Sequence, residues 1–229
     1  MNKIFVIEGT DGTGKETQTS LTYERLVKNG IPVYRTSFPN YDSDSSAPVK
    51  MYLKGLLGDN ANSVPEKPAS AFYAVDRYIT YITDIKQYYE DDKTIILLDR
   101  YVSSNLLHQG SKIIARGESF ENLDAYANWL HTFEFKDMEL PKPTATFFLY
   151  LPVDYSLKSM EARTNKFTHE TKKDIHETDK FHLENATKSG YYLAEKLGWN
   201  IINCLDEKGD RRTREDINDE IYSILQNFI

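Results

Sequence analysis

Short apolar runs alternate with amphipathic segments along most of the chain. Strands are predicted where the runs are rich in β-branched or aromatic residues, at residues 4–7, 31–38, 94–99, 146–151 and 199–204. Helices are predicted where apolar residues recur at helical spacing, at residues 18–26, 49–57, 65–91, 104–115, 120–136, 155–163, 181–197 and 214–228. This alternation is typical of an α/β fold, with a parallel sheet covered by helices on both faces.

The longest predicted helix, residues 65–91, carries both an apolar stripe and a candidate binding pair. Val75, Ile79, Ile82 and Tyr89 fall near one stripe, which we expect to face the core. The pair is formed by Tyr73 and Arg77, which are four residues apart and share a face away from that stripe. An aromatic ring beside a guanidinium can stack on a base and bond to its edge. Alternatively, the pair is exposed to solvent, or Tyr73 packs at a subunit contact.

The first predicted strand ends in a glycine-rich turn that leads directly into a helix. The turn reads Glu8-Gly-Thr-Asp-Gly-Thr-Gly-Lys15, with the spacing Gly-x-x-x-x-Gly-Lys of a phosphate-binding loop. Backbone N–H groups of such a loop bind phosphate oxygens, and the lysine adds a mobile positive charge. The flanking strand and helix disfavour a turn without a ligand. The predicted nucleotide-phosphate contacts are Gly9, Thr10, Asp11, Gly12, Thr13, Gly14, Lys15, Glu16 and Thr17.

One position inside this loop departs from the usual pattern. The residue after the lysine normally carries a hydroxyl that contacts Mg²⁺, but here it is Glu16, followed by Thr17. Glu16 can bind magnesium through water, or it can be a spectator while Thr17 contacts phosphate. A third interpretation is a helix-start glutamate that interacts favourably with the positive end of the helix dipole.

Chemistry-bearing residues also follow the second and third predicted strands. Phe38-Pro39 ends the second strand, and Asp99-Arg100 ends the third. Ligands of parallel sheets bind beyond the carboxyl ends of the strands, so these residues and the glycine loop should converge. Asp99 is expected to hold Mg²⁺ or its waters, and Arg100 to bind phosphate oxygens. The alternative is an Asp–Arg surface pair, which the upstream loop disfavours.

A polar cluster begins four residues after Arg100. Its members are Ser104, Asn105, His108 and Gln109. An amide offers both a donor and an acceptor, which is what a pyrimidine edge requires. Helix capping by Ser103 or Ser104 is a compatible alternative.

Composition and charge limit the class of protein. The chain has 229 residues, which predicts one domain over residues 1–229. Its net charge of −7 argues against a nucleic-acid or anionic-membrane partner. The single cysteine, Cys204, excludes an internal disulfide, and no apolar run reaches the length of a signal peptide core or a membrane span. We therefore expect a cytoplasmic protein.

Together, these motifs resemble those of bacterial thymidylate kinases. The resemblance rests on Glu8 to Lys15, Phe38-Pro39, Tyr73-Ala-Val-Asp-Arg77 and Asp99-Arg-Tyr-Val-Ser-Ser-Asn105, in that order and with similar spacing. Asp174-Ile-His-Glu177 is similar to the end of that family's lid. The resemblance spans nearly the whole chain. It implies a three-layer P-loop kinase sandwich with a mobile lid at about residues 164–177.

The resemblance also implies roles for single residues. The catalytic residues would be Lys15, Arg100 and Asp11, with Arg100 bridging the donor and acceptor phosphates. Arg163 would lie along adenine, as part of the ATP site, and Asp99, with Glu16, would hold the metal. In the dTMP site, Asp11 would contact the 3′-hydroxyl, His108 would lie at the 2′ position, and Phe38, Pro39 and Arg100 would lie at the monophosphate. Tyr73 would stack on thymine and Arg77 would bond to its carbonyl. Near the thymine edge would lie Ser104, Asn105 and Gln109.

Two further departures concern arginines that the family usually carries. Asn40-Tyr41 lacks the arginine that often follows Phe-Pro, which Lys50 or Arg100 can replace. The lid segment has Lys166, Lys172 and Lys173 but no arginine, and the glycine loop has none either. These lysines either contact the donor phosphates or belong to a solvated, charged loop.

The resemblance implies an ATP- and Mg²⁺-dependent enzyme that converts dTMP into dTDP, acting as a homodimer. The first alternative is a deoxynucleoside kinase, which needs a carboxylate base near Phe38, with Asp42 as a candidate. The second alternative is a nucleotide-binding module without catalysis, which Glu16 and the arginine-free lid would suit.

Overall fold

A computed structural model describes residues 3–58, 60, 62–91, 93–164 and 180–229, without the side chains of residues 161–164. The described residues form a five-stranded sheet in the order β2-β3-β1-β4-β5, and every neighbouring pair is parallel. The predicted parallel sheet is therefore confirmed. The strands are β1 (Lys3–Glu8), β2 (Val33–Ser37), β3 (Ile95–Asp99), β4 (Ala145–Tyr150) and β5 (Asn200–Asn203).

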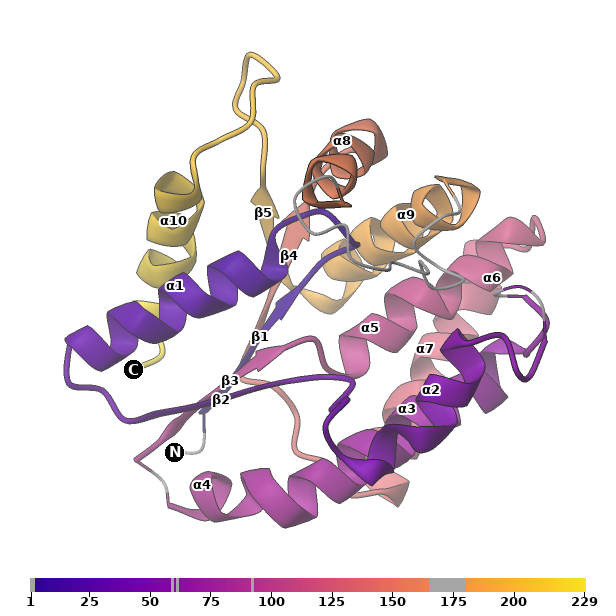
Figure 1. Cartoon of the computed structure of the whole chain (residues 1–229), viewed down its shortest axis with the longest axis horizontal. Coiled ribbons are helices and arrows are strands. Elements are labelled where there is room, and N and C mark those ends of the chain that lie inside the picture. Colours follow the sequence, from indigo (N-terminus) through magenta and orange to yellow (C-terminus); the bar gives the residue numbers. More distant parts are fainter. Residues whose placement is uncertain (1–2, 59, 61, 92, 165–179) are drawn as a thin grey trace.

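Helices cover both faces of this sheet (Figure 1). Along one face lie α1 (Lys15–Lys28) and α10 (Arg214–Gln226). The other face is covered by α5 (Val102–His108), α6 (Gly110–Ala115), α7 (Phe120–Thr132) and α9 (Lys180–Leu197). The remaining described helical elements are η1 (Asp44–Ser46), α2 (Ala47–Leu53), α3 (Glu66–Thr80), η2 (Tyr81–Ile85), α4 (Lys86–Glu90), η3 (Phe133–Asp137) and α8 (Val153–Thr164).

The central strand β1 shows why the core has two halves. Its side chains alternate between the two faces of the sheet, and all of Ile4 to Ile7 are buried. Phe5 and Ile7 pack in the cluster that contains residues of α1 and α10. Ile4 and Val6 pack in the cluster that contains residues of α5, α6 and α7. This explains the continuous apolar run, because a strand buried on both faces does not alternate with polar residues.

The predicted core stripe of the long helix is wrong at three of its four positions, whereas the fourth residue, Tyr89, packs against the core. The segment is continuous through α3, the π-helical turn η2 and α4, but Val75, Ile79 and Ile82 are exposed by 41%, 38% and 47%. The side of α3 that faces the molecule carries small and polar residues, among them Asp76 and Arg77. Apolar periodicity was misleading here because the buried polar groups have hydrogen-bond partners from distant segments, described below.

In the described part of the chain, no helix combines the length and the apolar character needed to cross a membrane.

Candidate active site

The predicted convergence of strand ends is confirmed. Ile7 of β1 and Ser37 of β2 both lie opposite Asp99 of β3, so three strands end at the same level. Two backbone hydrogen bonds continue this alignment past the strands, from Arg100 N to Ile7 O at 3.1 Å and from Phe38 N to Asp99 O at 2.9 Å. Segments far apart in the sequence therefore meet at one edge of the sheet.

The glycine loop between β1 and α1 is closed on itself and pressed against its neighbours. A Cβ at Gly9 would lie 2.8 Å from Leu149 O, and one at Gly12 would lie 2.5 Å from Ser156 O, so only glycine fits there. Lys15 Nζ donates to Thr10 O at 2.9 Å and lies 3.6 Å from Asp11 Oδ1. Burial, together with the neighbouring Arg100, lowers the pKa of Lys15 against the opposing influence of Asp11.

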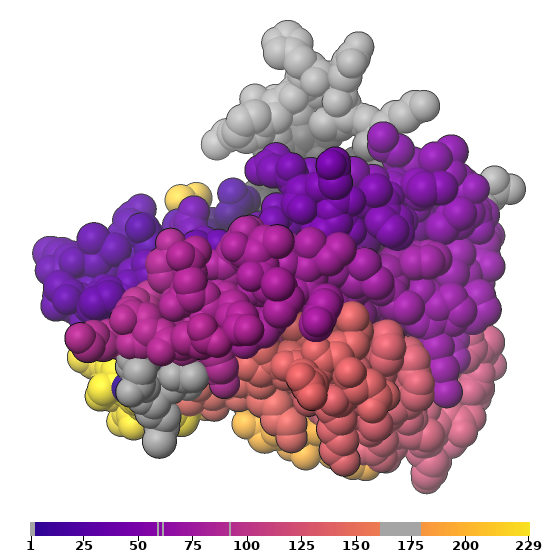
Figure 2. Space-filling view, turned by 90° about the horizontal axis from the view of Figure 1, so that it is seen from below, coloured from indigo at the N-terminus to yellow at the C-terminus, as the bar shows by residue number. Residues whose placement is uncertain are grey.

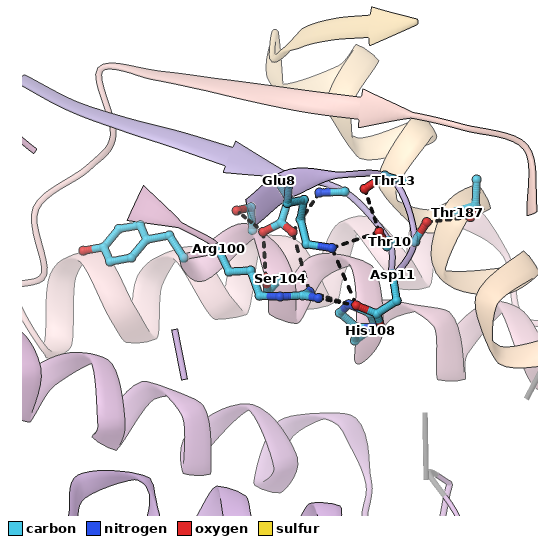
Figure 3. A network of polar contacts seen from close by, with 12 residues as sticks. Glu8, Thr10, Asp11, Thr13, Arg100, Ser104, His108 and Thr187 are labelled. Carbon is cyan, nitrogen blue, oxygen red and sulfur yellow. Dashed lines mark hydrogen bonds and ion pairs between the residues drawn. The ribbon is translucent and has the colours of Figure 1, made fainter. Parts of the chain in front are cut away.

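A buried carboxylate, Glu8, ties the loop to α5 (Figure 3). Its Oε1 accepts the N–H of Gly9 at 2.9 Å, and its Oε2 accepts the hydroxyls of Ser103 and Ser104 at 2.8 and 2.7 Å. The guanidinium of Arg100 lies 4.0 Å from Oε1. Ser104, predicted near the thymine edge, is thus bonded to Glu8 here. Glu8 opens the glycine turn that was predicted to converge with the other strand ends, but the prediction gave this carboxylate no contact of its own.

Arg100 stands at the centre of the polar network in Figure 3. Its guanidinium forms an ion pair with Asp11, and its Nη1 lies 3.1 Å from His108 Nε2. Burial would raise the pKa of Asp11, but Arg100 and Lys15 hold the pKa of this carboxyl well below its usual range. Two cations, Lys15 and Arg100, therefore lie beside Asp11 at the loop, with Glu8 also near Arg100, and cations in this position can bind anionic phosphates.

Asp99 and Glu16 are the predicted metal residues. Asp99 is half-buried and Glu16 is exposed. Burial raises the pKa of Asp99, and the negative charges of Glu8 and Glu16 add to this effect against Lys15 and Arg100. Within the described ranges, no three His, Cys, Asp or Glu side chains gather closely enough to hold a metal by themselves. The donor set fits a hard cation bound by one or two carboxylates together with substrate phosphates.

Among the residues predicted for the dTMP site, Arg77 is buried rather than exposed. Only 1% of its surface is accessible, and its Nε and Nη2 donate to the two oxygens of Glu134 at 2.7 and 2.6 Å. Burial lowers and Glu134 raises the pKa of Arg77, with a net increase that keeps the guanidinium charged. Tyr73 is half-buried, with its ring 6.4 Å from that of Tyr52. The alternative of a solvent-exposed pair is therefore wrong for Arg77.

Three other residues predicted for the dTMP site are Asn105 on α5, Gln109 directly after α5 and Phe38 directly after β2. Asn105 and Gln109 are buried one helical turn apart. Neither side-chain atom of Gln109 has a hydrogen-bond partner among the described residues. Phe38 is buried with its ring 5.8 Å from that of Tyr101, and a cis peptide bond joins it to Pro39.

His108 contacts a second histidine. Its Nδ1 lies 3.3 Å from His182 Nε2 of α9, and the two rings are stacked. Because His108 also lies beside Arg100, the histidine pair links Arg100 to the first turn of α9, which follows the predicted lid in the sequence. The predicted adenine residue Arg163 belongs to the residues whose side chains lie outside the description. Residues 165–177 of the predicted lid, with its lysines, also lie outside the described residues.

Comparison with known proteins now adds to this geometry. A protein-family model described as thymidylate kinase matches residues 7–199. The chain belongs to the thymidylate kinase family. A thymidylate kinase from Halothermothrix orenii is 27% identical over 224 residues, which cover 97% of this chain and 96% of the relative. A probable thymidylate kinase from Methanosphaera stadtmanae is 29% identical over 223 residues, covering 97% and 98%. A thymidylate kinase from Mycobacterium tuberculosis is 26% identical over 201 residues, covering 86% and 87%.

Two residues of this thymidylate kinase-like site had no signal in the sequence. Glu134, the partner of Arg77, stands alone in an aromatic segment without a recognisable motif. Arg211, from the loop after β5, donates from Nη2 to Thr13 O of the glycine loop at 2.6 Å. The glycine loop lacks an arginine of its own, so Arg211 places a guanidinium beside it from 198 residues further along the chain.

Proposed function

We propose that this chain transfers the γ-phosphoryl group of ATP to dTMP and releases dTDP and ADP. The observation that supports this most strongly is the placement of Arg100. Its guanidinium pairs with Asp11 of the glycine loop, while its backbone leads through Tyr101 into α5, which carries Asn105 and is followed by Gln109. A cation between the donor and acceptor sides is suited to the charge that develops during phosphoryl transfer.

The proposed chemistry is in-line transfer by positioning and charge neutralisation. The acceptor phosphate of dTMP is already anionic, so no side chain has to remove a proton from it. Lys15 and the backbone N–H groups of the loop bind the donor phosphates, and Arg100 exchanges part of its contact with Asp11 for phosphate oxygens. We assign the dTMP and ATP contacts to the residues that the sequence predicted for them.

We also propose that Mg²⁺ accompanies ATP, with Asp99 and Glu16 as the residues that would hold it or its waters. When bound, Mg²⁺ neutralises charge on the transferred group. The pKa of Asp99 is raised partly by Glu8 and Glu16, so a cation near these carboxylates would relieve their mutual repulsion.

A deoxynucleoside kinase is less well supported, because it requires a carboxylate base near Phe38. Asp42 is exposed. The buried Asp76 already accepts from Asn40 N at 2.9 Å and from Ser45 Oγ at 2.5 Å. Both hydrogen bonds stabilise the segment after β2, which gives this carboxylate a structural role.

Assembly and location complete the proposal. Val75, Tyr78, Ile79 and Ile82 are exposed at a spacing that places them on one side of the long helix. Figure 2 looks onto the side of the molecule where α3, η2 and α4 run beside α7 and η3. Such an apolar surface is typical of an interaction site, and we propose that a second copy of this chain covers it. We further propose a single domain over residues 1–229 that acts in the cytoplasm.

One assay separates the candidate functions. ADP release from ATP is followed with dTMP, with thymidine and without an acceptor, each with and without Mg²⁺. The proposal predicts Mg²⁺-dependent release with dTMP alone. Release with thymidine and not with dTMP would indicate a nucleoside kinase. No acceptor-dependent release, with ATP binding intact, would indicate a binding module.

A further inference from the structure

The buried carboxylate of Glu134 holds two of the predicted base-edge residues at once. Besides its two contacts with Arg77, its Oε1 accepts a hydrogen bond from Asn105 Nδ2 at 3.2 Å. Glu134 is completely buried, and it projects from the π-helical turn η3. A buried charge of this kind is stable only when paired and hydrogen-bonded, and Arg77 supplies the opposite charge.

This arrangement fixes the orientation of the Asn105 amide. Nδ2 donates both to Glu134 and to Ser70 O, the latter at 3.2 Å. If the amide were turned over, Oδ1 would face two acceptors, and both hydrogen bonds would become repulsive contacts. Among the described residues, none donates a hydrogen bond to Oδ1. Asn105 can therefore offer a ligand an acceptor, but not a donor.

Arg77 supplies the complementary half of the pattern. Its guanidinium has five N–H groups. Three are used, by the two oxygens of Glu134 and by Tyr101 O at 3.3 Å, and two are left without a described partner. One fixed acceptor and fixed donors match the imide edge of thymine or uracil, where N3–H is a donor and O4 an acceptor. Cytosine presents the reverse pattern, with N3 as acceptor and an amino group at C4.

Gln109 behaves differently from Asn105. It is fully buried, yet neither its Nε2 nor its Oε1 has a partner in the described structure. A buried amide without partners is rare and suggests that a ligand satisfies it. Because no described group fixes its orientation, it can turn to match either kind of base edge. Selectivity must then come from the amide that cannot turn.

We propose that Glu134 is a positioning residue that makes the acceptor site selective for an imide edge. It would favour dTMP and dUMP over dCMP by holding the Asn105 amide and the Arg77 guanidinium in one orientation. This inference rests on the proposed function, which places Asn105 and Arg77 beside the base. Mismatched donors and acceptors in a buried site are costly, because each leaves a group unpaired.

The test compares kcat/KM for dTMP, dUMP and dCMP at saturating ATP in wild type, E134Q and E134D. In E134Q the new amide can donate to Asn105 Oδ1, so only the contact with Ser70 O still opposes a turned-over Asn105 amide, and the amide is no longer held in one orientation by two acceptors. The preference for dTMP over dCMP should then fall by about tenfold or more, mainly through a higher KM for dTMP. The dTMP-to-dUMP ratio and the KM for ATP should not change. E134D keeps the negative charge, and its preference for dTMP over dCMP should lie between those of wild type and E134Q.

The control is E66Q, which makes the same chemical change in Glu66, a residue paired with Arg116 at the surface. It should keep wild-type ratios. An equal loss with all three acceptors in folded E134Q would overturn the proposal, as would equal kcat/KM for dTMP and dCMP in wild type. If E134Q does not fold, E134D decides, and an unchanged preference there overturns the proposal. A wild-type protein inactive on dTMP would instead contradict the proposed function.

Discussion

At the scale of single residues, Arg100 shows how a strained backbone serves a site. Its φ of 70° lies in the left-handed region, which costs a non-glycine residue on the order of 1–3 kcal/mol. In this conformation its N–H still bonds to Ile7 O, while its side chain turns toward Asp11. The strain is maintained because β1 and the glycine loop hold Arg100 at both ends.

Replacing Arg100 with alanine should therefore affect chemistry more than binding. Loss of one donor aimed at developing charge typically lowers kcat by about 10²–10³-fold. We expect this fall in Arg100→Ala, with little change in the KM for ATP, in a steady-state assay of ADP release. Arg116→Ala removes a surface arginine and should retain wild-type kcat. A folded Arg100→Ala variant with near-normal turnover would exclude Arg100 from catalysis.

Glu16 gives a second residue-scale prediction. If it helps Asp99 to hold Mg²⁺ or its waters, Glu16→Gln should raise the Mg²⁺ concentration needed for half-maximal activity. The expected change is roughly two- to fivefold, because an exposed charge contributes up to about 1 kcal/mol. Glu24→Gln, on the exposed side of the same helix, is the matched control. An unaltered Mg²⁺ requirement in Glu16→Gln would leave Glu16 as a helix-start residue.

Residue-scale prediction was possible where a motif was local and was not possible where a partner was distant. The glycine loop and Asp99-Arg100 are continuous stretches whose chemistry can be recognised from spacing alone. Glu134 and Arg211 act through contacts with residues 57 and 198 positions away. No pattern in the sequence encodes such pairings, because they depend on how the elements pack.

At the scale of elements, α6 is joined to the segment before α3 by a buried lysine. Lys112 Nζ donates to Val64 O at 2.6 Å and lies 5.2 Å from the ring centre of Tyr52. Burial lowers the pKa of Lys112 to about 8, against the opposing effect of Glu66 and with a further lowering by Arg116. The charged form is therefore disfavoured in the folded protein relative to the unfolded chain.

This shift predicts the direction of a pH effect on stability. Between pH 8 and the ordinary lysine pKa of 10.5, the unfolded chain binds more protons at this position than the folded protein. The contribution of Lys112 to the free energy of unfolding must therefore rise with pH across that interval. We expect the melting temperature of wild type to rise relative to that of Lys112→Met as the pH is increased from 7.5 to 10.5. A difference in melting temperature that does not change with pH would contradict the lowered pKa of Lys112.

The long helix shows the limit of element-scale prediction. Its existence and length followed from local periodicity, but its orientation was wrong, because an apolar stripe was assumed to face the core. Asp76 and Arg77 turn inward instead, since Ser45, Asn40 and Glu134 satisfy their polar groups. The apolar side of the helix is left at the surface, and an exposed apolar surface of this kind is typical of a site that another protein surface covers.

At the scale of the whole molecule, the alternation of strands and helices was enough to predict a parallel sheet with helices on both faces. The order β2-β3-β1-β4-β5 was not predicted, because β1 lies between β3 and β4 in the sheet and is next to neither of them in the sequence. The convergence of the first three strand ends was predicted nevertheless, since parallel strands deliver their carboxyl ends to one edge. The edge of the sheet that carries the candidate site could therefore be predicted from the fold class together with the motifs at the strand ends.

The exposed side of the long helix leads to a prediction about assembly. Stable interfaces bury about 800 Å² on each partner, and four large apolar side chains over two helical turns can supply their centre. Ile79→Asp places a charge in the middle of this side, where burial against a second copy would leave that charge unpaired. Light scattering coupled to gel filtration should show a dimer for wild type and a monomer for Ile79→Asp.

A matched variant separates loss of assembly from general damage. Val27→Asp introduces the same charge at an exposed apolar position of α1, away from the long helix, and should remain dimeric. Both variants should melt close to wild type when heated at low protein concentration, because neither residue belongs to the core. A monomeric wild type, or a dimer that persists in folded Ile79→Asp, would show that a second copy does not cover this side of the helix.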